Sequence, residues 1–207
     1  IRGVWFDLQV WRKGELLMLR RSHGFALLSL LFAGACASVP PAITGDPAMS
    51  VTARAETPPV GTAKQDAADD PAIWRNAANP AASLIVGTDK KGGLYVYDLK
   101  GAQKSFLPAS GLNNVDLVEL PDGRVLVLAS DRRDLAMAHI FVALLDTRSG
   151  TLTTVARVPI WQGEAYGICA SDVAADGSFD VYTTFKAGQI YRTGLQFIGS
   201  ELADETE

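Results

Sequence analysis

Short apolar runs separated by turn residues dominate the chain after residue 82. The runs are rich in β-branched and aromatic side chains, which is typical of β-strands. Glycine-containing turns such as Lys91-Gly92-Gly93 and Pro121-Asp122-Gly123 separate them, because glycine reaches the backbone conformations that tight turns need. The strands expected from this pattern cover residues 83–89, 93–99, 115–120, 125–131, 139–147, 151–159, 166–172, 179–186 and 189–195.

No amphipathic segment of helix length competes with these strands, so the pattern predicts an all-β fold. Regular short strands at this spacing are typical of a sandwich, a barrel or a β-propeller. In four-stranded blades the expected strands make about two blades and part of a third, whereas a closed propeller has ~4–8 blades. We expect no closing strand in residues 196–207, and therefore a chain that stops partway through its fold.

Residues 18–37 have the pattern of a signal peptide. Arg20 and Arg21 precede an apolar run over residues 25–32, and small residues follow at 33–38. Two forms of export remain open. Cys36 is a candidate for lipidation, which predicts a periplasmic or outer-membrane lipoprotein, whereas Ala33 and Ala35 equally suit simple cleavage and secretion.

The segments that flank the signal peptide have a different character. Residues 1–17 do not begin with Met, and we expect them to be upstream translation, with the natural start at Met18. Residues 38–62 are rich in Pro, Ala and Thr without an apolar period, which predicts a linker. Residues 63–207 are then expected to form a partial propeller domain.

Composition removes several classes of function. The chain has 207 residues, 48% of them hydrophobic, and a formal net charge of −4 without a basic stripe, which argues against nucleic-acid binding. Cys36 and Cys169 lie far apart, so neither a disulfide framework nor a zinc site is indicated. His23 and His139 form no catalytic pair, and there is no Gly-x-Ser-x-Gly motif of a serine hydrolase.

Carboxylates gather just before one apolar segment and at the head of the expected strand over residues 115–120. The segment Asp66–Trp74 contains Asp66, Asp69 and Asp70, and the segment Leu112–Asp116 adds Asn113, Asn114 and Asp116. A hard cation such as calcium relieves the repulsion between neighbouring carboxylates and accepts several oxygen ligands. The alternative for each segment alone is a solvated turn.

Basic residues recur at strand ends. Lys90 and Lys91 follow the run over residues 83–89, Arg132 follows the run over 125–131, and Lys186 ends the run over 179–186. Strand ends of a propeller can converge on one rim, and cations together with carboxylates suit a metal and a phosphorylated ligand. Exposed, solubilising side chains are the alternative.

These segments resemble the β-propeller phytases. The similarity rests on six motifs in the order and approximate spacing of that family: Asp66–Trp74, Gly87–Tyr97, Leu112–Asp116, Ala129–Arg132, Glu164–Gly167 and Lys186-x-Gly188. The resemblance implies a six-bladed propeller with Ca²⁺ at the rim. It also implies attack of a metal-activated water on a phosphomonoester of phytate, with inositol phosphates as substrates and a monomeric full-length protein.

The resemblance also implies roles for individual residues. Lys90, Arg132 and Lys186 are similar to the family's phosphate-binding cations, with Lys91 beside them, and Tyr166 is similar to its active-site tyrosine. The implied calcium ligands are Asp69, in the catalytic cluster, and Asp70, Asn113, Asn114 and Asp116, in a neighbouring structural site.

Two departures from the family keep other functions open. Ala187 stands where the family commonly has an acidic residue, and the later calcium-binding carboxylates of the family are not in the sequence. The first alternative is a non-catalytic propeller at the cell envelope that binds a phosphorylated ligand or a partner, with this chain inactive by itself. The second is a calcium-dependent lactonase or sugar dehydrogenase, for which the cations would have no purpose.

Overall fold

The structure is a computed structural model that describes residues 45, 48–62, 65–198 and 201–206, and of residues 198 and 201 the backbone alone. The signal peptide, the residues before it and Cys36 lie outside the described residues. Contacts divide the chain into Ile1–Met49 and Ser50–Glu207, and the second unit holds all the elements below. In the part of the chain that the structure describes, no helix is long and apolar enough to cross a bilayer.

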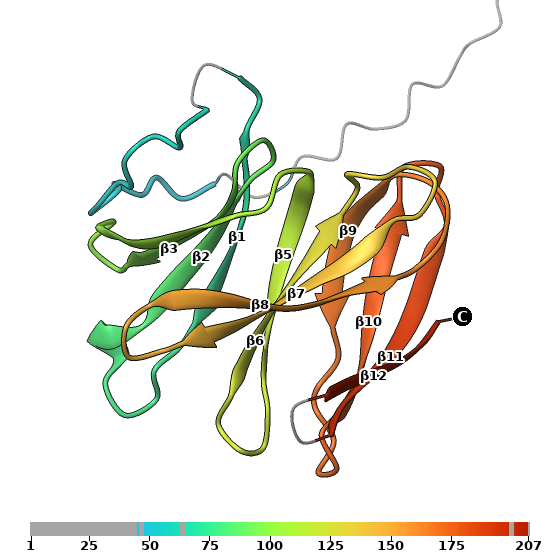
Figure 1. Ribbon diagram of the computed structural model, residues 1–207. Helices are drawn as coiled ribbons and strands as arrows, with labels where there is room; N and C mark the ends of the chain where they lie inside the picture. Colours follow the sequence, from blue (N-terminus) through green and yellow to red (C-terminus); the bar gives the residue numbers. More distant parts are fainter. Residues whose placement is uncertain (1–44, 46–47, 63–64, 199–200, 207) are drawn as a thin grey trace, which may run out of the picture. The chain divides into compact units, whose positions relative to one another are not determined.

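Twelve strands form three four-stranded antiparallel sheets in chain order (Figure 1). The first sheet consists of β1 (Ala68–Trp74), β2 (Leu84–Asp89), β3 (Gly93–Asp98) and β4 (Gln103–Pro108), with the 3-10 turn η1 (Pro80–Ala82) between β1 and β2. The second consists of β5 (Leu112–Glu119), β6 (Val125–Asp131), β7 (His139–Asp146) and β8 (Thr151–Pro159). The third consists of β9 (Ala165–Ala170), β10 (Ser178–Phe185), β11 (Ile190–Ile198) and β12 (Glu201–Thr206).

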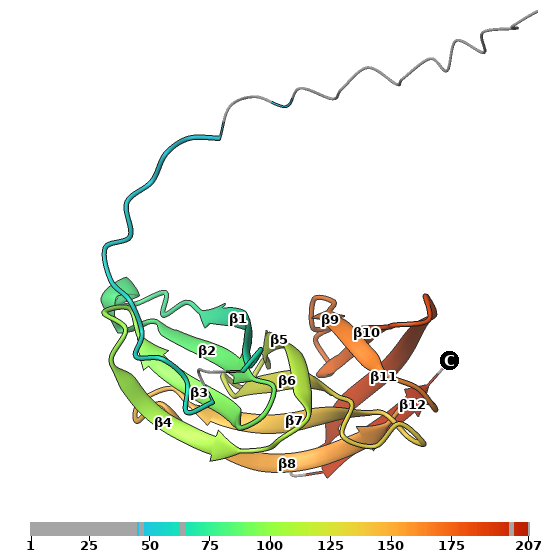
Figure 2. The ribbon, with the colours of Figure 1, turned by 90° about the horizontal axis from the view of Figure 1, so that it is seen from above.

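The sheets pack in the manner of successive propeller blades. Within each sheet, neighbouring strands are consecutive in sequence, and β5 contacts both β1 and β9. The first strands therefore lie along one side of the unit, whereas β4 and β8 lie along the opposite side (Figure 2). The all-β prediction is confirmed, and the four-stranded meanders are consistent with blades.

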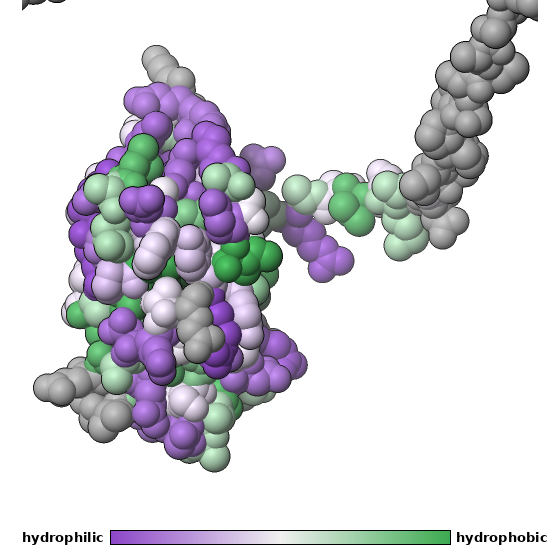
Figure 3. Space-filling view, turned by 90° about the vertical axis from the view of Figure 1, so that its right-hand side faces the viewer, coloured by the Kyte–Doolittle hydropathy of each residue, from purple (hydrophilic) through white to green (hydrophobic). Residues whose placement is uncertain are grey.

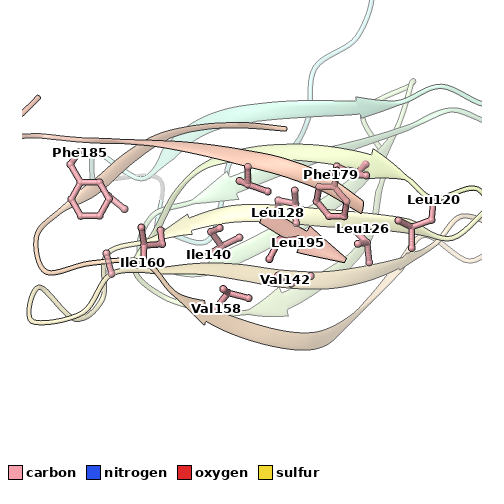
Figure 4. Close-up of a cluster of buried hydrophobic side chains, with 14 residues drawn as sticks. Leu120, Leu126, Leu128, Ile140, Val142, Val158, Ile160, Phe179, Phe185 and Leu195 are labelled. Atoms are coloured by element: carbon pink, nitrogen blue, oxygen red, sulfur yellow. The ribbon is translucent and has the colours of Figure 1, made fainter. Parts of the chain in front are cut away.

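The apolar core lies between the sheets. Alternate residues of β6 point to opposite faces, so Val125 and Val127 pack against the first sheet, and Leu126 and Leu128 against the third (Figure 4). All residues of β6 are buried, which explains why this strand is a continuous apolar run rather than an alternating one. The end of β6, directly before Arg132, is therefore held on both faces by packing against the neighbouring sheets.

The outward face of the third sheet is more polar than the two faces between sheets. Figure 3 views the molecule from this side, and hydrophilic residues cover much of it. Asp180 and Arg192 form an ion pair there, with 3.0 Å between Oδ2 and Nε. A pocket of about 560 Å³ lies on the same face.

The nine expected strands are present, β6 and β8 with the predicted ends and the others with shifted ends, and three further strands were not among those expected. They are β1, β4 and β12, and each lies at the edge of its sheet. The expectation that residues 196–207 hold no closing strand is wrong, because β12 pairs with β11 through the whole of Glu201–Thr206. An edge strand exposes one side to solvent, so its sequence need not carry the apolar pattern that reveals a central strand.

The end of the expected linker contacts the first sheet. The backbone N–H of Gly61 donates a hydrogen bond to the Tyr95 hydroxyl at 3.1 Å, and the Thr62 hydroxyl donates to the Asp89 carboxylate at 2.7 Å. These contacts hold Gly61 and Thr62 against the first sheet.

Candidate functional site

Lys90, Arg132 and Lys186 occupy the same position in the three sheets, since each follows the second strand of its sheet. The backbone N–H of each donates to the carbonyl of the residue that precedes the first strand of the same sheet. These pairs are Lys90 with Ala67 at 2.8 Å, Arg132 with Gly111 at 3.0 Å and Lys186 with Glu164 at 3.0 Å. The fold therefore repeats one backbone joint and brings a cation to the same edge of every sheet.

Gly111 connects the first two of these joints. Its N–H donates to the Lys90 carbonyl at 3.0 Å, and its own carbonyl accepts from Arg132. Its φ of +89° favours glycine, and a Cβ atom built on it would lie 2.7 Å from Cβ of Arg133. The close approach of Lys90 and Arg132 along the backbone thus depends on the absence of a side chain at this position.

Two carboxylates from the head of β1 hold the Lys90 side chain. Its Nζ lies 2.9 Å from Oδ1 of Asp66 and 3.3 Å from Oδ1 of Asp69, and the side chain is 11% exposed. The hydrogen bond to Asp66 raises the pKa of Lys90 and lowers that of Asp66. Lys91 and Arg132 also act electrostatically on Asp66, which places the cations of the first two sheets in one electrostatic neighbourhood.

Glu164 joins the cations of the second and third sheets. Its Oε1 lies 2.6 Å from Nη1 of Arg132, and its Oε2 lies 3.1 Å from Nζ of Lys186. Burial acts to raise the pKa of Glu164, but Lys186 and Arg132 outweigh it, and the pKa lies below the ordinary value. Both cations also lie over the ring of Tyr166, Arg132 at 4.9 Å and Lys186 at 5.7 Å from the ring centroid.

A buried carboxylate ends the second strand in two of the sheets. Asp89 accepts the N–H groups of Lys91 at 2.9 Å and of Gly92 at 3.0 Å. Asp131 accepts the N–H of Arg133 at 3.0 Å and also binds the guanidinium groups of Arg133 and Arg157. These carboxylates therefore organise the loops that begin with Lys90 and Arg132.

Asp70, Asn113 and Asn114 form a separate cluster of oxygen donors. Oδ2 of Asp70 accepts from Nδ2 of Asn114 and from the N–H of Val115, both at 3.1 Å, and Nδ2 of Asn113 donates to Oδ1 of Asn114 at 2.6 Å. Oδ1 of Asn113 is buried and has no hydrogen-bond partner among the described residues. An oxygen-only donor set with an unpaired buried oxygen fits a hard cation. Within the described residues no group of three or more His, Cys, Asp or Glu could hold a metal ion. A cation bound here would therefore need the side-chain oxygens of Asn113 and Asn114 as ligands.

The other expected metal ligands have different partners. Asp69 binds Lys90, and Oδ2 of Asp116 accepts the N–H of Ala170 at 2.8 Å, which ties β5 to β9. Lys91 is exposed, as is Ala187. The structure thus brings Asp70 together with the two asparagines, and Arg132 together with Tyr166 and Lys186.

Sequence reasoning did not assign roles to Asp89, Asp131 or Glu164, and it considered Asp66 only as one of three carboxylates near a possible cation. A signal for Glu164 was present, because it directly precedes a first strand, at the position that Ala67 and Gly111 occupy in the other sheets. Asp89 and Asp131 each end an apolar run next to a predicted cation. The pocket on the third sheet includes none of the predicted site residues.

The edge of the sheets that holds Lys90, Arg132 and Lys186 is rich in positive charge. Lys90, Arg132 and Lys186 supply N–H donors with full positive charge, and nearby carboxylates neutralise them. A group with several anionic oxygens can take the place of a carboxylate at such donors. The edge is therefore suited to an anion such as a phosphate ester.

Comparisons with known proteins agree with this character. A model of the family described as Phytase matches residues 22–200. The 3-phytase of Bacillus subtilis (strain 168) is 34% identical over 175 residues, which is 76% of this chain and 46% of that relative. The chain thus spans about half the length of this curated relative.

Proposed function

This chain belongs to the phytase family, and from that premise we propose that it forms the phosphate-binding part of an enzyme that hydrolyses phosphomonoesters of phytate. The observation that carries the proposal is the repeated strand-end joint, which brings Lys90, Arg132 and Lys186 to one edge. Phytate presents several phosphate groups on one ring, so cations from successive sheets can bind it together.

Each cation contributes a different kind of contact. Arg132 has a planar guanidinium that can bind two oxygens of one phosphate group, whereas Lys90 and Lys186 act as point charges. Lys90 is held by Asp66 and Asp69, so its ammonium group is oriented before a ligand arrives. Arg132 and Lys186 both form cation–π contacts with the Tyr166 ring, which favours positions of their charged groups close to it.

Calcium is the proposed cofactor, with Asp70, Asn113 and Asn114 as the residues that would hold it. The unpaired buried oxygen of Asn113 supports this assignment. Bound calcium would neutralise phosphate charge and lower the pKa of an attacking water. Asp69 and Asp116, which the family resemblance adds to the calcium ligands, are engaged with Lys90 and Ala170.

A second function has one observation in its favour. Ala187 follows Lys186 at a position where a carboxylate would add a further oxygen to the site. With a methyl group there, the edge retains phosphate-binding cations but has fewer groups that could hold a metal or a water. A non-catalytic protein that binds phosphorylated ligands fits such an edge. We propose export as its setting in either case, as a lipoprotein through Cys36 or as a secreted protein.

Phosphate release from inositol hexakisphosphate tests the two functions against each other. Release and binding are both measured for wild type, Arg132→Ala and the exposed control Arg148→Ala, prepared in the same way, with calcium or with a calcium chelator. Calcium-dependent release that Arg132→Ala reduces and Arg148→Ala retains supports the enzyme. Binding without release supports the second function, and absence of both binding and release contradicts both.

A further inference from the structure

Glu164 stands out because one carboxylate binds cations from two different sheets. Arg132 belongs to the loop after β6, and Lys186 to the loop after β10. Each carboxylate oxygen of Glu164 has one of them as a partner, at 2.6 Å and 3.1 Å. The backbone carbonyl of Glu164 accepts the N–H of Lys186 as well, so Glu164 holds that lysine at both ends.

The equivalent positions of the other sheets cannot perform this task. Ala67 and Gly111 also accept the N–H of the following cation, but neither has a polar side chain. In the first sheet Asp66 and Asp69 hold Lys90 instead. The bridge between sheets is therefore a property of Glu164 itself and not of the repeated fold.

The two cations would separate without a negative charge between them. Both lie over the ring of Tyr166 and bind the same carboxylate, and like charges held close together repel. The Arg132 side chain is 19% exposed, whereas the Lys186 side chain is 63% exposed and has more solvent around it. Loss of the carboxylate should therefore release Lys186 toward solvent rather than displace Arg132.

We propose that Glu164 is a positioning residue that sets the spacing between Arg132 and Lys186, so that both cations bind a single phosphate group. The proposal rests on the proposed function for the identity of the ligand. The bridge that Glu164 forms between Arg132 and Lys186 involves only residues of this chain, so it can be tested without any substrate.

The first test measures how readily Lys186 reacts with acetic anhydride. Peptide mass spectrometry compares Lys186 with the exposed Lys100 and Lys104 of the same molecule, in wild type, Glu164→Gln and Glu164→Asp. We expect Lys186 to react about threefold faster in Glu164→Gln, because its side-chain nitrogen no longer has a carboxylate partner and is more open to the reagent, and to stay closer to wild type in Glu164→Asp. Equal reactivity in all three proteins would overturn the bridge.

The second test measures the affinity for inositol hexakisphosphate by calorimetry. We expect Glu164→Gln to bind about tenfold more weakly, with partial recovery in Glu164→Asp. Asp180→Asn is the matched control, since it also removes a carboxylate from an arginine pair of the third sheet and should bind like wild type. Thermal melting followed by circular dichroism identifies any variant that fails to fold. If Glu164→Gln does not fold, the affinity of Glu164→Asp is compared with that of wild type instead.

A double-mutant cycle with Lys186→Met distinguishes positioning from a general structural effect. If Glu164 acts through Lys186, Glu164→Gln should add little to the loss already caused by Lys186→Met. Additive losses would contradict the proposal, and so would tighter binding by Glu164→Gln, which is the behaviour of an internal competitor. If wild type binds no inositol hexakisphosphate, the proposed function fails, while the labelling experiment still decides whether Glu164 holds Lys186.

Discussion

The guanidinium of Arg132 lies 4.9 Å from the ring centroid of Tyr166, although the two residues belong to different sheets. Arg132 follows the buried strand β6, and Tyr166 is the second residue of β9. The hydroxyl of Ser130 donates to the Tyr166 carbonyl, which fixes the backbone beneath the ring to the end of β6. The geometry of the site therefore depends on the packing between the second and third sheets.

Substitution of Gly111 should disturb both stability and the site. Gly111→Ala places a methyl group against Arg133 in a backbone conformation that alanine rarely adopts. We expect a loss of about 3 kcal/mol in the free energy of unfolding, measured by urea denaturation, because strain and steric overlap add. The affinity for inositol hexakisphosphate should fall as well, since Gly111 joins Lys90 to Arg132.

Gly123→Ala is the matched control for this prediction. Gly123 has a similar φ of +83°, but a Cβ atom there would meet nothing within 4 Å. Gly123→Ala should lower the free energy of unfolding by about 1 kcal/mol through the backbone conformation alone, and it should leave ligand affinity unchanged. Equal losses in the two variants would show that contact with Arg133 has no influence.

The Asp131 carboxylate should make stability depend on pH. Burial acts to raise its pKa, but hydrogen bonds from the Arg133 N–H and from the Arg157 and Arg133 guanidinium groups outweigh this, and the pKa lies below the ordinary 3.8. A lowered pKa in the folded state stabilises the protein above the unfolded value of 3.8, and this stabilisation disappears as the pH falls through the folded value. Asp131→Asn should therefore cost on the order of 2 kcal/mol near pH 7.

The difference between wild type and Asp131→Asn should narrow in acid. Urea denaturation at about pH 7 and about pH 3 provides the comparison. A constant difference at both values would mean that charge on Asp131 contributes nothing, and that the substitution acts through shape alone.

Calcium should raise the melting temperature of wild type, and Asp70→Asn should abolish most of this increase. A ligand that binds only the folded state stabilises it by an amount that grows with its concentration. The substitution retains the shape of Asp70 but removes the negative charge that an oxygen-liganded cation requires. Magnesium serves as the control ion, and Asp122→Asn, on a turn between β5 and β6, as the control variant. An equal calcium response in Asp70→Asn would argue against the cluster with Asn113 and Asn114.

Strands inside the sheets were predictable from sequence, whereas three of the edge strands were not. β6 was predicted to the residue, because burial on both faces produces an uninterrupted apolar run. β1, β4 and β12 carry mixed polar sequences, since one side of each has no neighbouring strand in the structure. The local pattern records burial, and these three edge strands are recognised only once their partner strands are known.

The site divides in the same way. Recurrence at strand ends is visible in the sequence and indicates Lys90, Arg132 and Lys186, because the position in a repeating sheet is a local property. The position of Glu164 before a first strand is visible in the same way, but its pairing with Arg132, across 32 positions of the sequence, is not. The engagement of Asp116 with Ala170, across 54 positions, likewise follows from sheet packing alone.

The most direct test of the account is whether Lys90 and Arg132 bind the same ligand. Calorimetric titration with inositol hexakisphosphate compares wild type, Lys90→Ala, Arg132→Ala and the double variant, with Lys104→Ala as an exposed control. We predict that each single substitution weakens binding by about tenfold to a hundredfold, and that the double variant shows coupling between the two sites. Unchanged affinity in both single variants would contradict the claim that equivalent strand ends converge on one phosphate-binding edge.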